Sequence, residues 1–168
     1  MENMVVLAPI LGVIALVFAF ALASKVSKMS EGTDRMKEIA GSIHEGALAF
    51  LTAEYKILIV FAVVLFLLIG FAIGWITAVC FVVGAAFSTL AGYFGMNVAT
   101  KANVRTANAA MEGGMNKALS VAFSGGAVMG MSVVGLGLLG ASGVFMVTGY
   151  FEVLTGYSLG GSSIAWFG

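Results

Sequence analysis

Two long stretches of this 168-residue chain contain no ionisable side chain: residues 57–100 and 118–151 carry no Asp, Glu, Lys, Arg or His. Across the chain, 10% of residues are charged and 61% are hydrophobic, whereas soluble domains carry about 25% charged residues. This composition identifies an integral membrane protein. Hydrocarbon offers no water to unpaired backbone groups, so the uncharged stretches are expected to be helices. The sequence therefore predicts an all-α membrane protein, a polytopic helical bundle.

The uncharged stretches predict four transmembrane helices and the start of a fifth. A helix needs about 20 apolar residues to cross a bilayer, so residues 57–100 cross twice, with a turn at Gly70, Gly74 and Trp75. Residues 118–151 would extend about 51 Å as one helix, so this segment should tilt, project from the membrane or break at its glycines. The expected spans, all within one membrane domain over residues 1–168, are residues 4–24, 55–73, 75–100, 118–150 and the incomplete 155–168.

The basic residues indicate the orientation. Five of the eight lie in residues 25–56 and three in residues 101–117. Cytoplasmic loops of membrane proteins are enriched in Lys and Arg. We therefore expect cytoplasmic loops at residues 25–54 and 101–117, the N-terminus outside, and a last segment that heads towards the cytoplasm. The chain would be a multi-pass integral membrane protein, of the cell membrane if it is prokaryotic.

The first of these loops contains an amphipathic helix between the first two spans. Apolar residues recur in it at steps of three and four from Met36 to Leu51, which is one helical face. Thr33 is the expected N-cap. The helix should run along the membrane surface or along the bundle and then feed into the second span. A connector without chemistry is the favoured interpretation.

Small residues recur at four-residue steps in the uncharged stretches. Such rows let helix backbones approach closely in lipid, where the hydrophobic effect does not drive association. Gly135, Gly137 and Gly140 also fit G-x-G-x-x-G, but a dinucleotide site needs a preceding strand, and here the context is an apolar helix. We therefore expect packing, against more neighbours than this chain supplies. The rows are Gly84-Ser88-Gly92, Ala91-Gly95-Ala99 and Gly126-Gly130.

Few other residues are candidates for chemistry. His44 is the only histidine and has no partner at metal-ligand spacing, so a solvated surface histidine is favoured over a ligand. Cys80 lies in an apolar run and is expected to be a packing residue. Lys101 and Arg105 lie four apart on a helix and could meet an anion, although an ordinary basic flank of a span is the preferred interpretation.

The uncharged stretches also argue against a reaction centre. Ionisable residues inside membrane helices mark ion pathways, and residues 57–100 and 118–151 have none. We therefore expect no catalytic, substrate-binding or metal-binding residue in this chain. The net charge of +0 gives no support for a nucleic-acid partner.

Four segments together resemble the N-terminal part of the membrane-bound, ion-pumping pyrophosphatases. They occur in that family's order and cover the chain from about Glu31 to its end, and Trp166 stands where a smaller aliphatic residue is expected. The segments are EGTDRMKEIAGSIHEGALAFLTAEYK from Glu31, GMNVATKANVRTANAA from Gly95, AFSGGAVMGMSVVGLGLLG from Ala122 and GYSLGGSSIAWFG from Gly156.

The resemblance implies more than the composition does. Members of that family are homodimers of long chains with about sixteen helices in two rings. They hydrolyse pyrophosphate at the cytoplasmic face with Mg²⁺, some depend on K⁺, and they move H⁺ or Na⁺ outward. By this resemblance the chain is an N-terminal fragment that ends before the acidic substrate motif. Its first four helices would brace the inner ring, and the fragment alone would be inactive and bind no cofactor.

Three other interpretations compete with this one. A rotary-ATPase proteolipid would need a carboxylate in mid-membrane, which the uncharged stretches lack. A fragment of a secondary transporter would bind its substrate at helices broken near the midplane, and its candidate site would be the glycine-rich residues 125–140. A small non-catalytic membrane assembly subunit would use its small-residue faces to bind a partner, and should fold and stay monodisperse when expressed alone.

Overall fold

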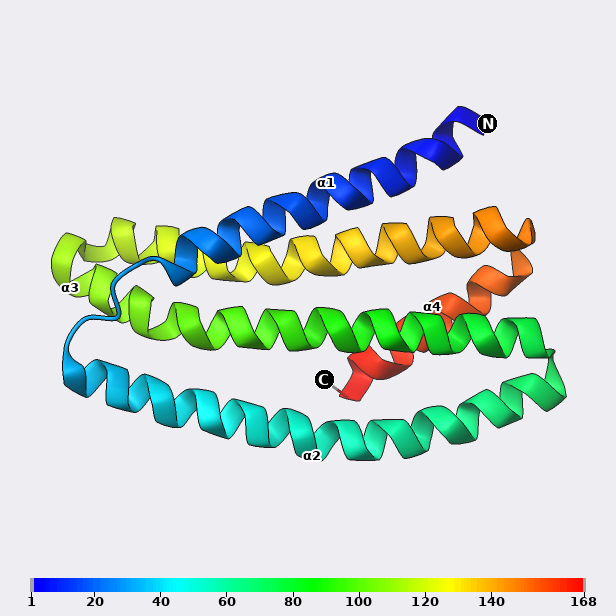
Figure 1. Cartoon of the computed structure of the whole chain (residues 1–168), viewed down its shortest axis with the longest axis horizontal. Coiled ribbons are helices and arrows are strands. Elements are labelled where there is room, and N and C mark those ends of the chain that lie inside the picture. The colour runs from blue at the N-terminus through cyan, green and yellow to red at the C-terminus, as the bar shows by residue number, and fades with distance from the viewer. Residues whose placement is uncertain (1, 168) are drawn as a thin grey trace.

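The computed structural model describes residues 2–167, and only the backbone of residues 2–5 and 167. Four helices follow one another: α1 (Glu2–Ser27), α2 (Asp34–Ala72), α3 (Trp75–Thr148) and α4 (Glu152–Phe167). Figure 1 shows α1, α2 and the two halves of α3 running along the long axis of the molecule, with α4 crossing them obliquely. The predicted all-α bundle is confirmed.

The helix α3 doubles back on itself at Gly114. This residue has φ 70° and ψ −168° inside an otherwise helical element, a backbone conformation that glycine adopts without a steric penalty. A Cβ on Gly125 would lie 2.7 Å from the Cβ of Ala102, and one on Gly95 would lie 2.6 Å from Cγ of Met129. The first arm of α3 (residues 75–113) therefore packs antiparallel against its second arm (residues 115–148).

Within the described part of the chain, three helices are long and apolar enough to cross a membrane: Val6–Ser27, Asp34–Ala72 and Trp75–Thr148. The helix α4 has 16 residues, fewer than the number of about 20 that a perpendicular crossing needs. The 39 residues of α2 extend about 58 Å at about 1.5 Å per residue. The hydrocarbon layer is about 30 Å thick, so α2 has to project beyond it.

In α2 the amphipathic segment feeds directly into the second span, as expected. The amphipathic segment of residues 36–51 and the second span form one continuous helix from Asp34 to Ala72, so the segment runs along the bundle. Thr33 caps this helix as predicted, with its side-chain oxygen accepting a hydrogen bond from the backbone N–H of Met36 at 3.4 Å. The polar residues of the segment favour helix once the N-terminal N–H groups have a cap.

The second expected loop, residues 101–117, is also mainly helical. The first arm of α3 continues through residue 113, and only Gly114 leaves the helical conformation. The second arm then runs without a break past all its glycines to Thr148. Of the three outcomes expected for this stretch, breakage at the glycines of residues 125–140 is therefore wrong.

The turn between α2 and α3 lies where the sequence predicts it. Ile73 is the C-cap of α2, and Gly74 precedes the first residue of α3 with φ 158°. Trp75 then folds back on α2, where its ring lies 5.9 Å from that of Phe66. A Cβ on Gly70 would lie 2.7 Å from this indole, so glycine provides the space for the tryptophan. Ile69, Ala78 and Phe81 form the buried cluster beside this turn.

Candidate functional site: the Arg105 network and the seat of α4

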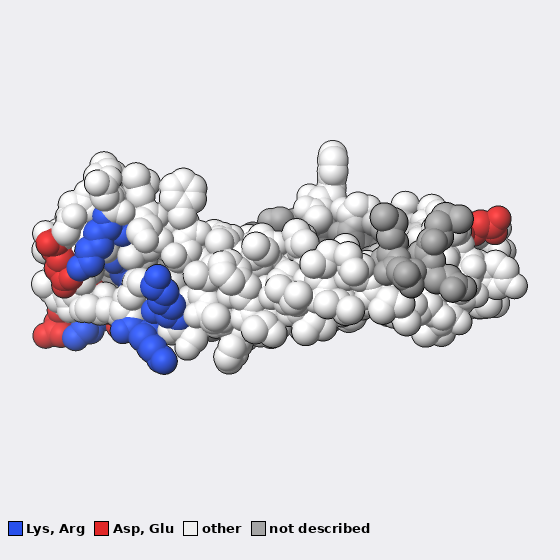
Figure 2. All heavy atoms as spheres, turned by 90° about the horizontal axis from the view of Figure 1, so that it is seen from above, with Lys and Arg blue, Asp and Glu red and all other residues white. Residues whose placement is uncertain are grey.

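Charged side chains gather at one end of the molecule. Figure 2 shows the Lys and Arg side chains together with most of the visible acidic ones at the end that carries the α1–α2 linker and the Gly114 turn, and an uncharged surface beyond them. The basic residues around the α1–α2 linker and those of residues 101–117 thus lie at the same end of the bundle, as expected if they face the same side of a membrane, whereas Lys56 lies about halfway along α2. The opposite end is formed by the turns at Gly74 and Gly149.

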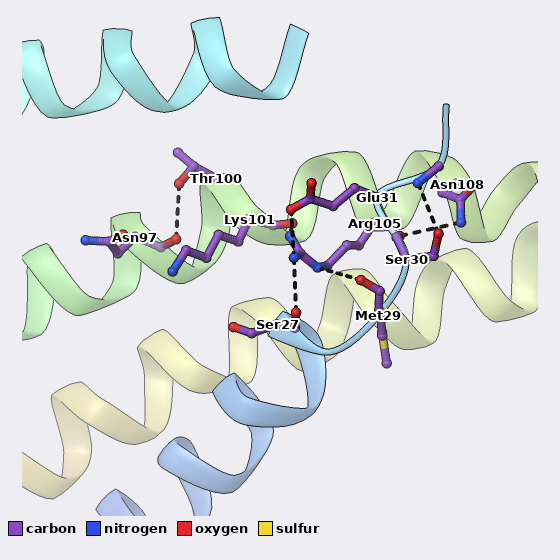
Figure 3. A network of polar contacts seen from close by, with 10 residues as sticks. Ser27, Met29, Ser30, Glu31, Asn97, Thr100, Lys101, Arg105 and Asn108 are labelled. Carbon is purple, nitrogen blue, oxygen red and sulfur yellow. Dashed lines mark hydrogen bonds and ion pairs between the residues drawn. The ribbon is translucent and has the colours of Figure 1, made fainter. Parts of the chain in front are cut away.

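Arg105 is the centre of a polar network at the charged end (Figure 3). Its side chain is 7% exposed, and it makes four hydrogen bonds. Nε donates to the carbonyl of Met29 at 3.1 Å and Nη1 to that of Lys101 at 2.8 Å. Nη2 donates to the carbonyl of Ser27 at 3.1 Å and to Oε1 of Glu31 at 2.9 Å.

These contacts give hydrogen-bond partners to carbonyl groups at the C-terminal end of α1. The last carbonyls of a helix have no partner within it and carry a partial negative charge. The guanidinium of Arg105 binds the carbonyl of Ser27, the last residue of α1, and that of Met29 two residues later. The planar fork of arginine places several donors at once. Arg105 therefore fastens α1 and the α1–α2 linker to the first arm of α3.

The anion role considered for Lys101 and Arg105 finds no support in this geometry. The donors of Arg105 are directed at carbonyl oxygens and at the carboxylate of Glu31, whereas Lys101 is exposed. The two residues do not converge on a shared position. Sequence spacing alone could not reveal this, because three of the four acceptors lie 74 to 78 residues away from Arg105 in the chain.

Asn108 extends the network by one helical turn. Its side-chain Nδ2 donates to the carbonyl of Ser30 at 3.5 Å and to Oε1 of Glu112 at 2.9 Å. Gly32 lies opposite with φ 81°, and a Cβ at this position would be 2.7 Å from Oδ1 of Asn108. The linker needs glycine here both for its conformation and for the close approach of this amide.

Glu112 closes the network beside the Gly114 turn. Lys117 donates to its carboxylate at 2.8 Å. The hydrogen bonds from Lys117 and then Asn108, together with the positive charge of Lys117, hold the pKa of the Glu112 carboxyl below its ordinary value. Both side chains of the pair are about half exposed, so the contact contributes little at high salt.

This lowered pKa predicts a pH dependence. A carboxyl whose pKa is lower in the folded state stabilises the fold above its unfolded pKa, and that stability is lost as the pH falls through its folded pKa. The helical circular dichroism of the protein in detergent should therefore become less heat-resistant below about pH 4.5, near the ordinary pKa of glutamate. The Glu112→Gln variant should lose part of this decline, and Lys117→Gln should do the same. Unchanged pH curves in both variants would contradict the assignment.

His44 differs from its expected place on a solvated surface. It is half-buried, and its Nδ1 lies 3.2 Å from Oγ1 of Thr100. The Thr100 hydroxyl itself donates back to the carbonyl of Met96 at 3.0 Å, so its oxygen is free to accept a hydrogen bond from the imidazole. The pair links α2 to the first arm of α3. Among the described residues no group of three or more His, Cys, Asp or Glu side chains could hold a metal ion.

Glycines interlock α3 and α4. A Cβ on Gly84 of α3 would collide with the carbonyl oxygen of Tyr157, and one on Gly160 of α4 would collide with that of Phe81. Because each glycine faces the backbone of the other helix, the two helices approach as closely as small residues permit in lipid. Ser88, one turn beyond Gly84, donates to the carbonyl of Gly161 at 3.1 Å. We call this contact the α4 seat.

Tyr157 is the side chain that fills the α4 seat. It is buried, its hydroxyl donates to the carbonyl of Leu136 at 3.0 Å, and its ring meets that of Phe87 edge-on at 6.4 Å. A Cβ on Gly140 would collide with its ring. Cys80 packs in the same cluster with Val153 and Tyr157, which confirms its role as a packing residue.

The glycines therefore divide into packed positions and open positions, where open means that no described atom lies within 4 Å of the Cβ position. Gly84 and Ser88 contact α4, and Gly95 contacts the second arm of α3. In the G-x-G-x-x-G match, Gly135 lies against Leu16 of α1, whereas Gly137 has no described atom within 4 Å of its Cβ position. All the glycines of this match lie inside α3, so a dinucleotide loop is excluded. The open glycines include Gly126, Gly130, Gly137, Gly143 and Gly161.

The chain is similar to known proteins over nearly its whole length. The family model described as inorganic H⁺ pyrophosphatase matches residues 13–168. A relative from Clostridium tetani named "Putative K(+)-stimulated pyrophosphate-energized sodium pump" is 57% identical over 168 residues, 99% of this chain and 25% of that protein. A K⁺-insensitive pyrophosphate-energized proton pump of Methanosarcina mazei is 43% identical over 99% of this chain and 25% of its own length.

A third relative is the K⁺-stimulated pyrophosphate-energized sodium pump of Thermotoga maritima, which is 39% identical over 92% of this chain and 24% of its own length. The chain thus spans about a quarter of the length of the curated relatives it matches. The relatives include pumps named for H⁺ and pumps named for Na⁺. Since the family model covers residues 13–168, this multi-pass integral membrane chain belongs to the inorganic H⁺ pyrophosphatase family.

Proposed function

We propose that this chain is the N-terminal scaffold portion of a membrane pump that couples pyrophosphate hydrolysis to outward transport of H⁺ or Na⁺. The observation that carries the proposal is the family match over residues 13–168, together with 57% identity to a pump of which the chain covers 25%. In this proposal the reaction centre is completed by residues from the other three quarters of the pump. The role of this chain is then to hold elements that the rest of the protein completes.

The α4 seat is the part of the chain with the most direct scaffold role. In this proposal α4 is an inner-ring helix whose cytoplasmic end leads to the substrate motif, and α1 to α3 are outer-ring helices that brace it. The interlocked Gly84 and Gly160 fix the distance between α3 and α4, and the hydrogen bond from Tyr157 to the second arm of α3 fixes the rotation of α4. Small errors in the position of catalytic groups cost large factors in rate.

The chemistry would depend on residues outside this chain. Pyrophosphate carries several negative charges, so its site needs Mg²⁺ ions and basic side chains that neutralise the phosphate oxygens and activate water. Among the described residues no cluster of three or more suitable side chains offers a metal site. The complete pump would be a homodimer whose K⁺ response, H⁺ or Na⁺ selectivity and catalytic groups come from the remaining sequence.

The charged end of the bundle is proposed to face the cytoplasm. The α1–α2 linker and the Gly114 turn lie at this end, which carries the basic residues, and the positive-inside rule assigns such an end to the cytoplasmic side. The N-terminus would be outside. A cysteine placed at exposed Ser30 should react with an impermeant maleimide only in inside-out vesicles.

The secondary-transporter and proteolipid interpretations lose their basis with the family match. The small assembly subunit remains the second candidate, because open glycines such as Gly126 and Gly130 are suited to a partner helix. Expression of residues 1–168 alone separates the two. A self-sufficient subunit should elute as one monodisperse species in detergent, whereas a scaffold portion should aggregate or be degraded.

The gene provides a direct test of the proposal. We expect the reading frame to remain open past the codon for Gly168 and to encode aspartate-rich segments that also contain lysine. Such segments supply the carboxylates that hold Mg²⁺ and the cations that bind pyrophosphate. A stop codon directly after Gly168 would contradict the pump and favour the assembly subunit.

A further inference from the structure

A cavity of about 620 Å³ lies between α2, both arms of α3 and α4. Its walls are mainly apolar and small side chains, and Glu54 of α2 is the acidic residue among them. Hydroxyl groups of the walls, such as those of Tyr55 and Ser162, have partners within the chain. Tyr55 donates to the carbonyl of Thr89 at 3.2 Å, and Ser162 donates to that of Ser158 at 2.8 Å.

Glu54 is different because its Oε1 is buried and has no hydrogen-bond partner among the described residues. Lys56 lies two positions further along α2 and is exposed, so it projects from another side of the helix. The ion pairs found in the described part of the chain join other residues. The Glu54 side chain as a whole is half-buried, and ionisable side chains at membrane depth almost always have a partner.

The glycines of the cavity wall indicate what kind of group approaches. Gly137 and Gly161 have no described atom within 4 Å of their Cβ positions, and Gly92 has only the Tyr55 hydroxyl at 4.0 Å. Glycine inside a helix is less stable than alanine by about 1 kcal/mol. Glycines on three sides of one cavity are explained if another helix backbone approaches there closely. Flexible lipid chains would not need this space.

We propose that a further transmembrane helix of the same pump, from the three quarters of the protein outside this chain, enters this cavity and pairs a Lys or Arg with Glu54. The inference rests on the proposed function. Glu54 lies three residues before the uncharged stretch that begins at residue 57, about halfway along α2. The partner cation therefore belongs at the same level of the bundle, facing the middle of α2. The pair locks the entering helix to α2 and, through the cavity wall, to α4.

A substitution tests the pairing before the partner is known. In the full-length pump, Glu54→Leu removes a carboxylate from an apolar cavity. If a buried cation faces it, the variant leaves that cation unpaired, and the half-life of pyrophosphatase activity at elevated temperature should fall at least tenfold. Glu45→Leu is the control, because Glu45 is an exposed acid on the same helix, and its half-life should stay within twofold. A Glu54→Leu variant at least as durable as the wild type overturns the inference.

Crosslinking tests the identity of the occupant. A benzoylphenylalanine placed at Phe50, which lines the cavity, should crosslink within the same polypeptide to a peptide outside residues 1–168 with a Lys or Arg within about one helical turn. The control at Phe20, which is 78% exposed on α1, should not crosslink to that peptide. Crosslinks from Phe50 only to lipid, to a second copy or to residues 1–168 would overturn the inference. Pyrophosphate hydrolysis is measured on the same preparation, to distinguish failure of this inference from failure of the proposed function. A wild-type protein that does not hydrolyse pyrophosphate would contradict the proposed function itself.

Discussion

Replacing Gly84 with leucine should release α4 from its seat and lower the heat stability of the protein. A side chain at this position meets the carbonyl oxygen and carbonyl carbon of Tyr157 and the backbone N–H of Gly161. These are backbone atoms of a helix, so they cannot rotate away as a flexible side chain would. Overpacking a well-filled site costs about 1–3 kcal/mol and occasionally more, and we expect the upper part of this range. The melting temperature in detergent should fall by about 5 °C or more.

A matched control exists on the same helix. Gly143 lies on the second arm of α3, and no described atom is within 4 Å of its Cβ position. Gly143→Leu should leave the melting temperature within about 2 °C of the wild type, because it gains helix propensity without a clash. Gly160→Leu should reproduce the loss seen for Gly84→Leu, since Gly160 faces the backbone of Phe81 and Ala85. Equal melting temperatures for Gly84→Leu and Gly143→Leu would show that the α4 seat is not as described.

Replacing Arg105 with methionine should destabilise the charged end of the bundle by about 2–4 kcal/mol. The change removes all four donors at once and leaves the carbonyls of Ser27 and Met29 without this partner. Removing one member of a buried pair costs about 3–5 kcal/mol, and the 41% exposure of Glu31 reduces this because its carboxylate can turn to water. Limited proteolysis at the α1–α2 linker, residues 28–33, should become much faster.

Two further variants define the cause of this effect. Arg105→Lys keeps the charge but not the planar fork, so it should recover about half of the lost stability. Lys101→Met changes an exposed cation one helical turn away and should leave cleavage of the linker unchanged. If Lys101→Met accelerates cleavage as much as Arg105→Met does, then general charge at this end holds the linker, and the specific contacts of Arg105 do not.

Local rules predict the parts of this fold that depend on a few neighbouring residues. Thr33 caps α2 because a hydroxyl three residues before a free N–H is a short-range contact. The turn at Gly74 follows from glycine and from the length of an uncharged stretch that is too long for one crossing. These features, and the helical character of the bundle, could be derived from the sequence alone.

The Gly114 turn shows where charge patterns mislead. Residues 101–117 are polar enough to be taken for a loop, yet their side chains are compatible with helix, and α3 continues to residue 113. The Gly113-Gly114 pair in the sequence was the available signal, because one glycine with positive φ is enough to reverse the chain. The polarity of a segment indicates that it lies outside the membrane, but it does not indicate whether the segment is helical.

The partners of the functional residues could not be predicted in the same way. Arg105 was visible as a basic residue, but its acceptors at Ser27, Met29 and Glu31 are 74 or more residues distant. Gly84 was expected to pack against some helix, and the structure identifies α4 as that helix. The sequence does not indicate that Glu54 Oε1 lacks a hydrogen-bond partner, because this depends on which residues surround it in the fold. Such pairings depend on how helices are arranged, and no local rule encodes that arrangement.

Pyrophosphate-driven ion transport tests the central claim most directly. The protein encoded by the reading frame that contains this chain should be reconstituted in sealed liposomes with Mg²⁺ and K⁺ and supplied with pyrophosphate. We expect phosphate release together with uptake of H⁺ or Na⁺ into the lumen, and collapse of the ion gradient by a matching ionophore while hydrolysis continues. The Gly84→Leu variant should lose both activities. A wild-type protein that neither hydrolyses pyrophosphate nor moves either ion would contradict the account.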